Sequence, residues 1–264
     1  MRLIIGLVVA GFAFFSFLSK REVNPTTGQV QYISLTREQE ISMGIQAQPQ
    51  MIQQFGGMDP DPEAQALVDL VGERLVRNSF AVKSEYPFEF TLLADDQTIN
   101  AFALPGGPIF ITAALFNRLE TEGQLAGVLG HEIGHVIARH GAQRIAKQEL
   151  TEGLTGAVVM AACDGGQSCQ GTARMAQMIG GLVNMKYGRA DELESDELGL
   201  EIMLEAGYDP SSMIRVMEIL AEAGGGARQP EFMSTHPDPG NRVENIRQFV
   251  ETNFPNGVPS DLDP

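Results

Sequence analysis

The chain contains no tryptophan, only two cysteines and four histidines among its 264 residues, and 18 basic residues against 34 acidic ones. The formal charge of −16 disfavours contact with nucleic-acid phosphates or anionic membrane surfaces, because both depend on clustered Lys and Arg. No basic run occurs, so we expect no nucleic-acid partner. Apolar residues form 43% of the chain and charged residues 20%, which is typical of a globular protein and excludes collagen-like, disordered and multi-span membrane proteins.

The two cysteines, Cys163 and Cys169, flank a Gly-Gly pair and are six positions apart. Zinc knuckles space their thiols two to four residues apart and use four ligands, so this pair does not predict a knuckle. Two interpretations remain open, a disulfide formed in an oxidising compartment or two unpaired thiols.

The N-terminus carries the one long apolar run, Leu3 to Leu18, followed by Lys20 and Arg21. A helix over this run would be roughly 24 Å long, shorter than the roughly 30 Å hydrocarbon core of a bilayer. We predict residues 1–19 to be a signal peptide or a short membrane anchor. The protein is therefore expected in the periplasm or cell envelope, with residues 3–18 as a possible tether to the inner membrane.

The remaining chain is expected to form one domain over residues 36–254, after a turn-rich linker at 20–35 and before a disordered tail at 255–264. Helix starts are indicated at Thr36 and at Asp61-Pro62, each with acidic residues in the first turn. Alternating apolar residues predict strands at 87–93 and 108–112, and the pattern after Glu120 is helical. The predicted fold class is α+β, mostly α, with a small β-sheet among helices.

The strongest chemical motif is His131-Glu-Ile-Gly-His135. On a helix the two histidines lie about 40° apart and one turn from each other, which lets both imidazoles reach one zinc ion. Glu132 points beside that face, where a carboxylate can hold a water without being a ligand. The opposite side of the helix is apolar, so we expect one face to be buried and the histidine face to line a cleft.

A catalytic zinc needs a third protein ligand and an open fourth position. The metzincin arrangement is excluded because Ala138 and Gly141 stand where it requires Gly and His. His140 would fall about 180° from His131 on a continuous helix, so we interpret it as a capping or core-edge residue.

The acidic stretch after Tyr187 contains a better candidate for the third ligand. There Glu192 and Asp196 share one helical face with apolar neighbours, and a buried Glu192 favours a metal partner. Asp196 is placed to accept the second ring N–H of a ligating histidine.

Four motifs together resemble the M48 family of zinc metalloendopeptidases over roughly residues 36–250. They are Asn100-Ala-Phe-Ala-Leu-Pro-Gly-Gly107, His131-Glu-Ile-Gly-His135, Arg189-Ala-Asp-Glu192 with Asp196, and Ser234-Thr-His-Pro237 with Arg242. The resemblance implies a zincin-like metallopeptidase domain with an active-site helix and one zinc ion per chain. It implies three zinc ligands, which are His131, His135 and Glu192. It also implies Glu132 as the catalytic base and Asp196 as the carboxylate that accepts a hydrogen bond from a ligating histidine. His236 and Arg242 are expected to face the site. Gly188 and Ser195 depart from the usual Ser and Ala of the family.

These assignments predict a protease that hydrolyses unfolded or misassembled envelope proteins as part of protein quality control. Glu132 would take the proton of the attacking water and return it to the leaving amine, while His236 or Arg242 would stabilise the developing oxyanion.

A further hypothesis is that His236 fills the fourth zinc position and keeps the enzyme latent. The strand at 108–112 would pair with an extended substrate if it has a free edge, and would be interior if it does not. Residues 155–185 are expected to form a helical hairpin, as core or as a lid.

Two alternative functions follow from the same residues. An envelope chaperone or assembly factor would hold unfolded clients and cleave rarely, so it would not depend on Glu132. A zinc-stabilised structural protein would unfold without metal, and gives no reason for a glutamate between the two histidines. The sequence leaves the oligomeric state and the physiological substrate open.

Overall fold

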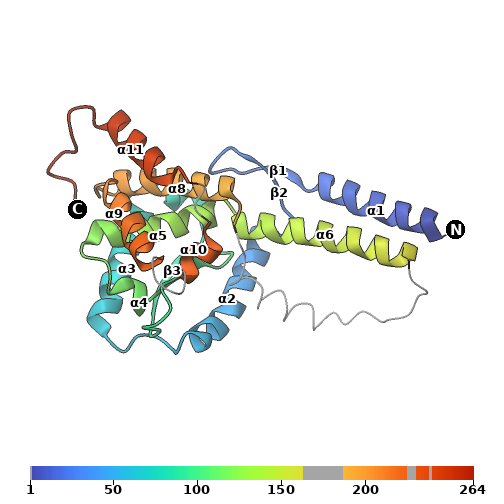
Figure 1. Cartoon of the computed structure of the whole chain (residues 1–264), viewed down its shortest axis with the longest axis horizontal. Coiled ribbons are helices and arrows are strands. Elements are labelled where there is room, and N and C mark those ends of the chain that lie inside the picture. Colours follow the sequence, from blue (N-terminus) through green and yellow to red (C-terminus); the bar gives the residue numbers. More distant parts are fainter. Residues whose placement is uncertain (1, 163–186, 225–229, 238–239) are drawn as a thin grey trace.

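The computed structural model describes residues 2–162, 187–224, 230–237 and 240–264, with helices α1–α6 and α8–α11 and strands β1–β5 (Figure 1). The elements are α1 (Arg2–Ser19), β1 (Arg21–Val23), β2 (Val30–Tyr32), α2 (Arg37–Gln54), α3 (Pro62–Arg77), the short 3₁₀ helix η1 (Phe80–Ser84), β3 (Glu89–Leu93), β4 (Ala101–Ala103), β5 (Pro108–Thr112), α4 (Ala113–Phe116), α5 (Glu122–Ile137), α6 (His140–Ala162), α8 (Arg189–Glu205), α9 (Ser212–Gly224), α10 (Glu231–Thr235) and α11 (Arg242–Asn253). The expected mostly helical α+β class is confirmed.

Local capping explains where the first domain helices begin. Thr36 accepts a hydrogen bond from the Gln39 amide, and the Gln39 side chain accepts one from the Thr36 amide, so α2 starts with a capping box. Asp61 caps α3 through the amides of Glu63 and Ala64, with Pro62 as the first helical residue. Both helix starts were predicted from the sequence and are confirmed.

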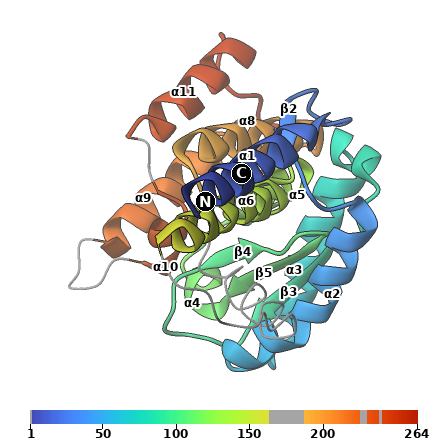
Figure 2. The ribbon, with the colours of Figure 1, turned by 90° about the vertical axis from the view of Figure 1, so that its right-hand side faces the viewer.

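The domain sheet has three strands in the order β3–β5–β4, with β3 parallel and β4 antiparallel to β5. Both predicted strands exist, but β4 was not predicted. Since β5 is paired on both sides, Pro108–Thr112 is the interior strand of the two alternatives and offers no edge to a substrate. The edge strand beside the helix α5 is β4, and Figure 2 shows the sheet below α5 and α6.

The helix α5 runs through the middle of the core, and every residue from Gly123 to Ile137 is buried. Its closest partner is α8 (Figure 1). Glycines allow this approach, because a Cβ on Gly199 would stand 3.0 Å from the His131 nitrogen and one on Gly134 would stand 2.9 Å from the Ser195 carbonyl oxygen. Ser195 fills the remaining space and donates a hydrogen bond to the His131 carbonyl. The two predicted metal-binding helices are therefore in direct backbone contact.

The segment 20–35 differs from the linker predicted there, because β1 and β2 form an antiparallel hairpin in it. Two hairpin side chains cap the C-terminal end of α5. Asn24 donates to the Ile137 carbonyl at 2.8 Å, and Gln31 donates to the Ala138 carbonyl at 2.7 Å. These bonds satisfy carbonyls that a helix end leaves without partners.

The N-terminal run predicted as a signal peptide or anchor forms α1, which lies along α6 and extends with it away from the rest of the molecule (Figure 1). Its large apolar side chains are mostly exposed. Within the part of the chain that the structure describes, no helix combines the length and the apolar character needed to cross a membrane.

The C-terminal segment 255–264 also differs from the disordered tail predicted for it. Arg74 on α3 donates to the Asp263 carboxylate at 2.6 Å, and Asp263 exchanges backbone hydrogen bonds with Gly207 and Asp209. The Gly123 amide donates to the carbonyl of Pro264 at 2.8 Å. This segment is held by contacts to residues far away in the sequence, which its composition does not reveal.

Candidate metal centre

The helix α5 presents His131 and His135 on one face, one turn apart. Their Nε2 atoms are 3.0 Å apart and the rings are 1% and 2% exposed. The predicted helical spacing therefore brings the two imidazole nitrogens together. In the described part of the chain, α8 and the segment around His236 cover this face, so the two histidines are buried and do not line the open cleft that was expected.

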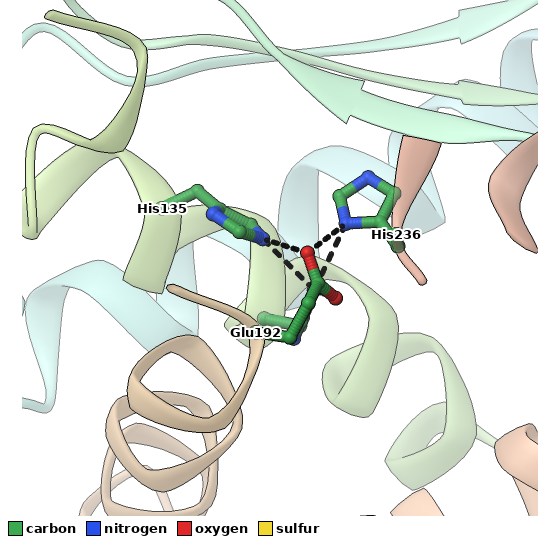
Figure 3. Close-up of side chains that lie close together, drawn as sticks. His135, Glu192 and His236 are labelled. Carbon is green, nitrogen blue, oxygen red and sulfur yellow. Dashed lines mark hydrogen bonds and ion pairs between the residues drawn. The ribbon is translucent and has the colours of Figure 1, made fainter. Parts of the chain in front are cut away.

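The helix α8 supplies Glu192, which is fully buried against the two histidines. Its Oε2 lies 3.5 Å from His131 Nε2 and its Oε1 lies 3.5 Å from His135 Nε2. Figure 3 shows Glu192 pointing between His135 and His236, with its contacts to both drawn as dashed lines. The structure thus brings together all three residues predicted as ligands.

His236 joins this group from the residue that follows α10. Its Nδ1 is 3.2 Å from Glu192 Oε1 and 3.3 Å from His131 Nε2, and the ring stacks on Phe232 with centroids 4.4 Å apart. One ligand atom each from His131, His135, Glu192 and His236 lie within 4.8 Å of one another. His236 therefore belongs to the cluster itself.

Asp196, one helical turn after Glu192, lies behind His131. Its Oδ1 is 2.9 Å from His131 Nδ1, so the imidazole can donate to the carboxylate while its Nε2 faces the cluster. The guanidinium of Arg242 contacts both Asp196 oxygens and also Glu192 Oε2, at 3.2 Å. Because its three nitrogens all contact carboxylates, Arg242 is placed to hold these acids. Its geometry does not match the expected oxyanion donor.

Glu132 is buried, and neither of its side-chain oxygens has a hydrogen-bond partner among the described residues. His236 Nε2 lies 3.6 Å from Glu132 Oε1 and also has no hydrogen-bond partner among the described residues. Burial raises the pKa of Glu132 above its usual value, although nearby imidazoles oppose this effect. A buried, unpartnered carboxylate beside a cluster of ligand atoms indicates a group that a water or substrate would complete.

The cluster is polarised as a cation site would be. Burial alone would lower the pKa of His131, but hydrogen bonds to Asp196 and Glu192 outweigh it and raise that pKa to about 9. Burial alone would raise the pKa of Glu192. The neighbouring His236 and His131 outweigh burial and hold this pKa well below the usual range. The acids behind the histidines thus favour a positive charge between them.

The residues fit a zinc ion by distance and by chemistry. A tetrahedral site with bonds of about 2.1 Å separates its ligand atoms by roughly 3.4 Å. Five separations within the cluster are 3.0, 3.2, 3.3, 3.5 and 3.5 Å, with Glu192 contacting His131 through Oε2 and the other two histidines through Oε1. With one ligand atom taken from each residue, all four atoms lie within 4.8 Å of one another. Imidazole nitrogens and one carboxylate oxygen are ligand types that zinc accepts.

Two further side chains that the sequence did not assign to the site contact His135. The ring of Tyr187 stacks on it with centroids 3.9 Å apart. His140 places its Nδ1 2.8 Å from His135 Nδ1 and its Nε2 3.3 Å from Glu194 Oε2. The helical wheel misplaced His140, because α5 ends at Ile137 and His140 begins α6. The only feature of the sequence that pointed to these contacts was the close spacing of His131, His135 and His140.

Part of the predicted hairpin at 155–185 lies in α6, which extends to Ala162. Residues 163–186 lie outside the described part of the chain, so the disulfide and the two-thiol interpretations of Cys163 and Cys169 stay open.

Comparison with known proteins agrees with this geometry. The model of peptidase family M48 matches residues 62–250. A beta-barrel assembly-enhancing protease of Yersinia pestis is 32% identical over 99% of this chain and 54% of its own length. The protein of the same name from Escherichia coli K12 is 31% identical over 94% of this chain and 51% of its own. The mitochondrial metalloendopeptidase OMA1 of Bos taurus is 27% identical over 94% and 50%. The chain spans about half the length of these relatives.

Proposed function

The chain belongs to peptidase family M48, and from that premise we propose that it is a zinc-dependent metalloendopeptidase with one zinc ion per chain. The proposed ligands are His131, His135 and Glu192. The observation that carries the proposal is the convergence of these side chains at 3.0–3.5 Å beside the unpartnered carboxylate of Glu132. A zinc ion bound there supplies a Lewis acid that polarises a peptide carbonyl and activates water.

The chain's own residues then carry the proton and hold the geometry. Glu132 takes the proton of the attacking water and gives it to the amine that leaves, a task suited to a carboxylate whose pKa is raised by burial. Asp196 holds His131 through Nδ1, and Arg242 holds Asp196. His236 Nε2 lies 3.6 Å from Glu132 Oε1, and we propose that it contacts the developing oxyanion when its segment moves off the ligands.

The same position of His236 supports a latent resting state. Its Nδ1 lies among the ligand atoms, so we propose that His236 takes the fourth zinc position until a substrate displaces it. The site is buried, as expected of a resting enzyme. If the variant His236→Ala showed unchanged basal proteolysis, and a water already occupied the fourth position in the wild type, latency would be rejected.

Substrates are proposed to be extended segments of unfolded or misassembled envelope proteins, consistent with relatives named as proteases that enhance β-barrel assembly. The edge strand β4 is the element that would pair with such a segment, since it lies against the active-site helix α5. Export to the periplasm or cell envelope is part of the same proposal.

The alternative is an envelope assembly factor that holds clients and cleaves them rarely. The buried metal site gives this alternative some support. The test is degradation of casein by the zinc-loaded wild type and by Glu132→Gln. Cleavage by the wild type alone supports the protease, whereas client binding without cleavage by either protein supports the assembly factor.

A further inference from the structure

We propose that His140 and Glu194 form a hydrogen-bonded chain that positions the metal ligand His135. The inference deepens the proposed function and rests on it, because it takes His135 as a ligand. It concerns a pair of residues for which the sequence gave no role at the site.

The first support is the turn between α5 and α6. On a continuous helix, residues five positions apart lie about 140° from each other, so His140 would point away from His135. Instead α5 ends at Ile137, and Arg139 adopts a left-handed conformation with φ of 57°. This turn brings His140 Nδ1 to 2.8 Å from His135 Nδ1.

The turn is held from outside the two helices. Arg139 donates to the buried carboxylate of Glu40 on α2 and, at 2.9 Å, to the Leu35 carbonyl. A non-glycine residue with positive φ persists when its surroundings fix it, and these contacts supply that restraint. The placement of His140 against His135 is therefore built into the tertiary structure.

The positions of the imidazole hydrogens follow from the requirement that His135 binds zinc. His135 Nε2 faces Glu192 and the cluster, so it must keep its lone pair to bind zinc, and Nδ1 carries the hydrogen. His135 Nδ1–H then donates to His140 Nδ1. With Nδ1 as acceptor, His140 carries its hydrogen on Nε2 and donates it to Glu194 Oε2, 3.3 Å away. One chain of donors and acceptors thus runs from ligand to carboxylate.

The other histidine ligand has the same arrangement with one residue fewer. His131 donates directly to Asp196, whose side chain is 4% exposed. For His135 the carboxylate is reached through His140, and Glu194 is 28% exposed. Both His131 and His135 are therefore backed by a carboxylate from α8, and such partners fix ring orientation and raise ligand basicity.

The test is zinc affinity, measured by competition with a chromophoric chelator on the full chain. His140→Phe keeps the ring and removes both nitrogens, and should weaken zinc binding about tenfold to a hundredfold. Glu194→Ala should weaken it in the same direction by a smaller factor. Glu197→Gln, on the exposed side of the same helix, is the matched control and should stay within about twofold of the wild type. Cobalt substitution adds a spectrum, and the visible bands of His140→Phe should shift while those of Glu197→Gln should not.

A folded His140→Phe protein with wild-type zinc affinity and an unchanged cobalt spectrum would overturn the proposal. If that variant does not fold, the nitrogen-15 shifts of the imidazoles in the zinc-loaded wild type decide. The proposal requires the hydrogen of His140 on Nε2, and a hydrogen on Nδ1 would contradict it. These readouts do not depend on proteolysis, so a wild type that binds zinc but cleaves nothing would refute the proposed enzyme and leave this inference standing. A wild type that binds no zinc would refute both.

Discussion

Arg242 contacts both carboxylate oxygens of Asp196, with Nε 2.7 Å from Oδ2 and Nη2 2.6 Å from Oδ1. The pair is buried, with side chains 2% and 4% exposed. A planar guanidinium matches a carboxylate in this two-bond geometry, whereas a lysine ammonium does not. The α11 helix is thereby tied to α8 at the carboxylate that holds His131.

Replacing Arg242 by Leu should lower the free energy of unfolding by about 3–5 kcal/mol, because it leaves Asp196 buried without the cation that contacts both of its oxygens. Arg242→Lys should recover only part of this loss. Urea denaturation of the zinc-loaded proteins measures the change. Arg247→Leu on the exposed side of α11 is the control and should change stability by less than about 0.5 kcal/mol. Equal effects of the two leucine variants would contradict the account of the pair.

The close contact between α5 and α8 makes a second prediction. A Cβ at Gly134 would stand 2.8 Å from Ser195 Oγ and 2.9 Å from its carbonyl oxygen, so Gly134→Ala must push the helices apart. We expect a loss of about 1–3 kcal/mol in unfolding free energy and weaker zinc binding as Glu192 moves. Denaturation and chelator competition test both effects.

Gly127→Ala is the matched control for that variant, about two helical turns earlier on α5. Its Cβ would meet Met213 at 3.5 Å, an ordinary contact. The substitution should be neutral or stabilise the protein by up to about 1 kcal/mol, since alanine favours helix more than glycine does. Similar losses for the two alanine variants would show that the α5–α8 distance is not the limiting feature.

Removing zinc with a chelator should abolish cleavage of casein and lower the melting temperature without unfolding the chain. Ligand linkage at a thousandfold excess over the dissociation constant contributes about 4 kcal/mol, which is lost with the metal. The fold is expected to survive because the hydrophobic core around α5 does not depend on the cluster. Far-ultraviolet circular dichroism and restored activity with one equivalent of zinc provide the measurement. Complete unfolding of the metal-free chain would favour the zinc-stabilised structural protein.

The sequence predicted those parts of the site that lie within single helices. His131 and His135 share a face of α5, and Glu192 and Asp196 share a face of α8, because helical periodicity fixes which residues lie together. The periodicity stops being informative where a helix ends. His140 was misplaced for that reason, since Arg139 turns the chain between α5 and α6.

Other differences arise from contacts between distant segments. The hairpin within residues 20–35 is ordered by bonds from Asn24 and Gln31 to the end of α5, and the C-terminal segment by Arg74 with Asp263. Composition alone made both segments look irregular. The strand β4 is three residues long, too short for an alternating pattern, so the sequence could not decide whether β5 is an edge strand or an interior one.

The central claim is that Glu132 is the proton carrier of a zinc protease. The most direct test compares casein degradation by the wild type and by Glu132→Gln at equal, measured zinc content. The account predicts that the glutamine variant keeps its zinc and its fold but loses cleavage by at least about a hundredfold. Equal cleavage by the two zinc-loaded proteins would contradict it.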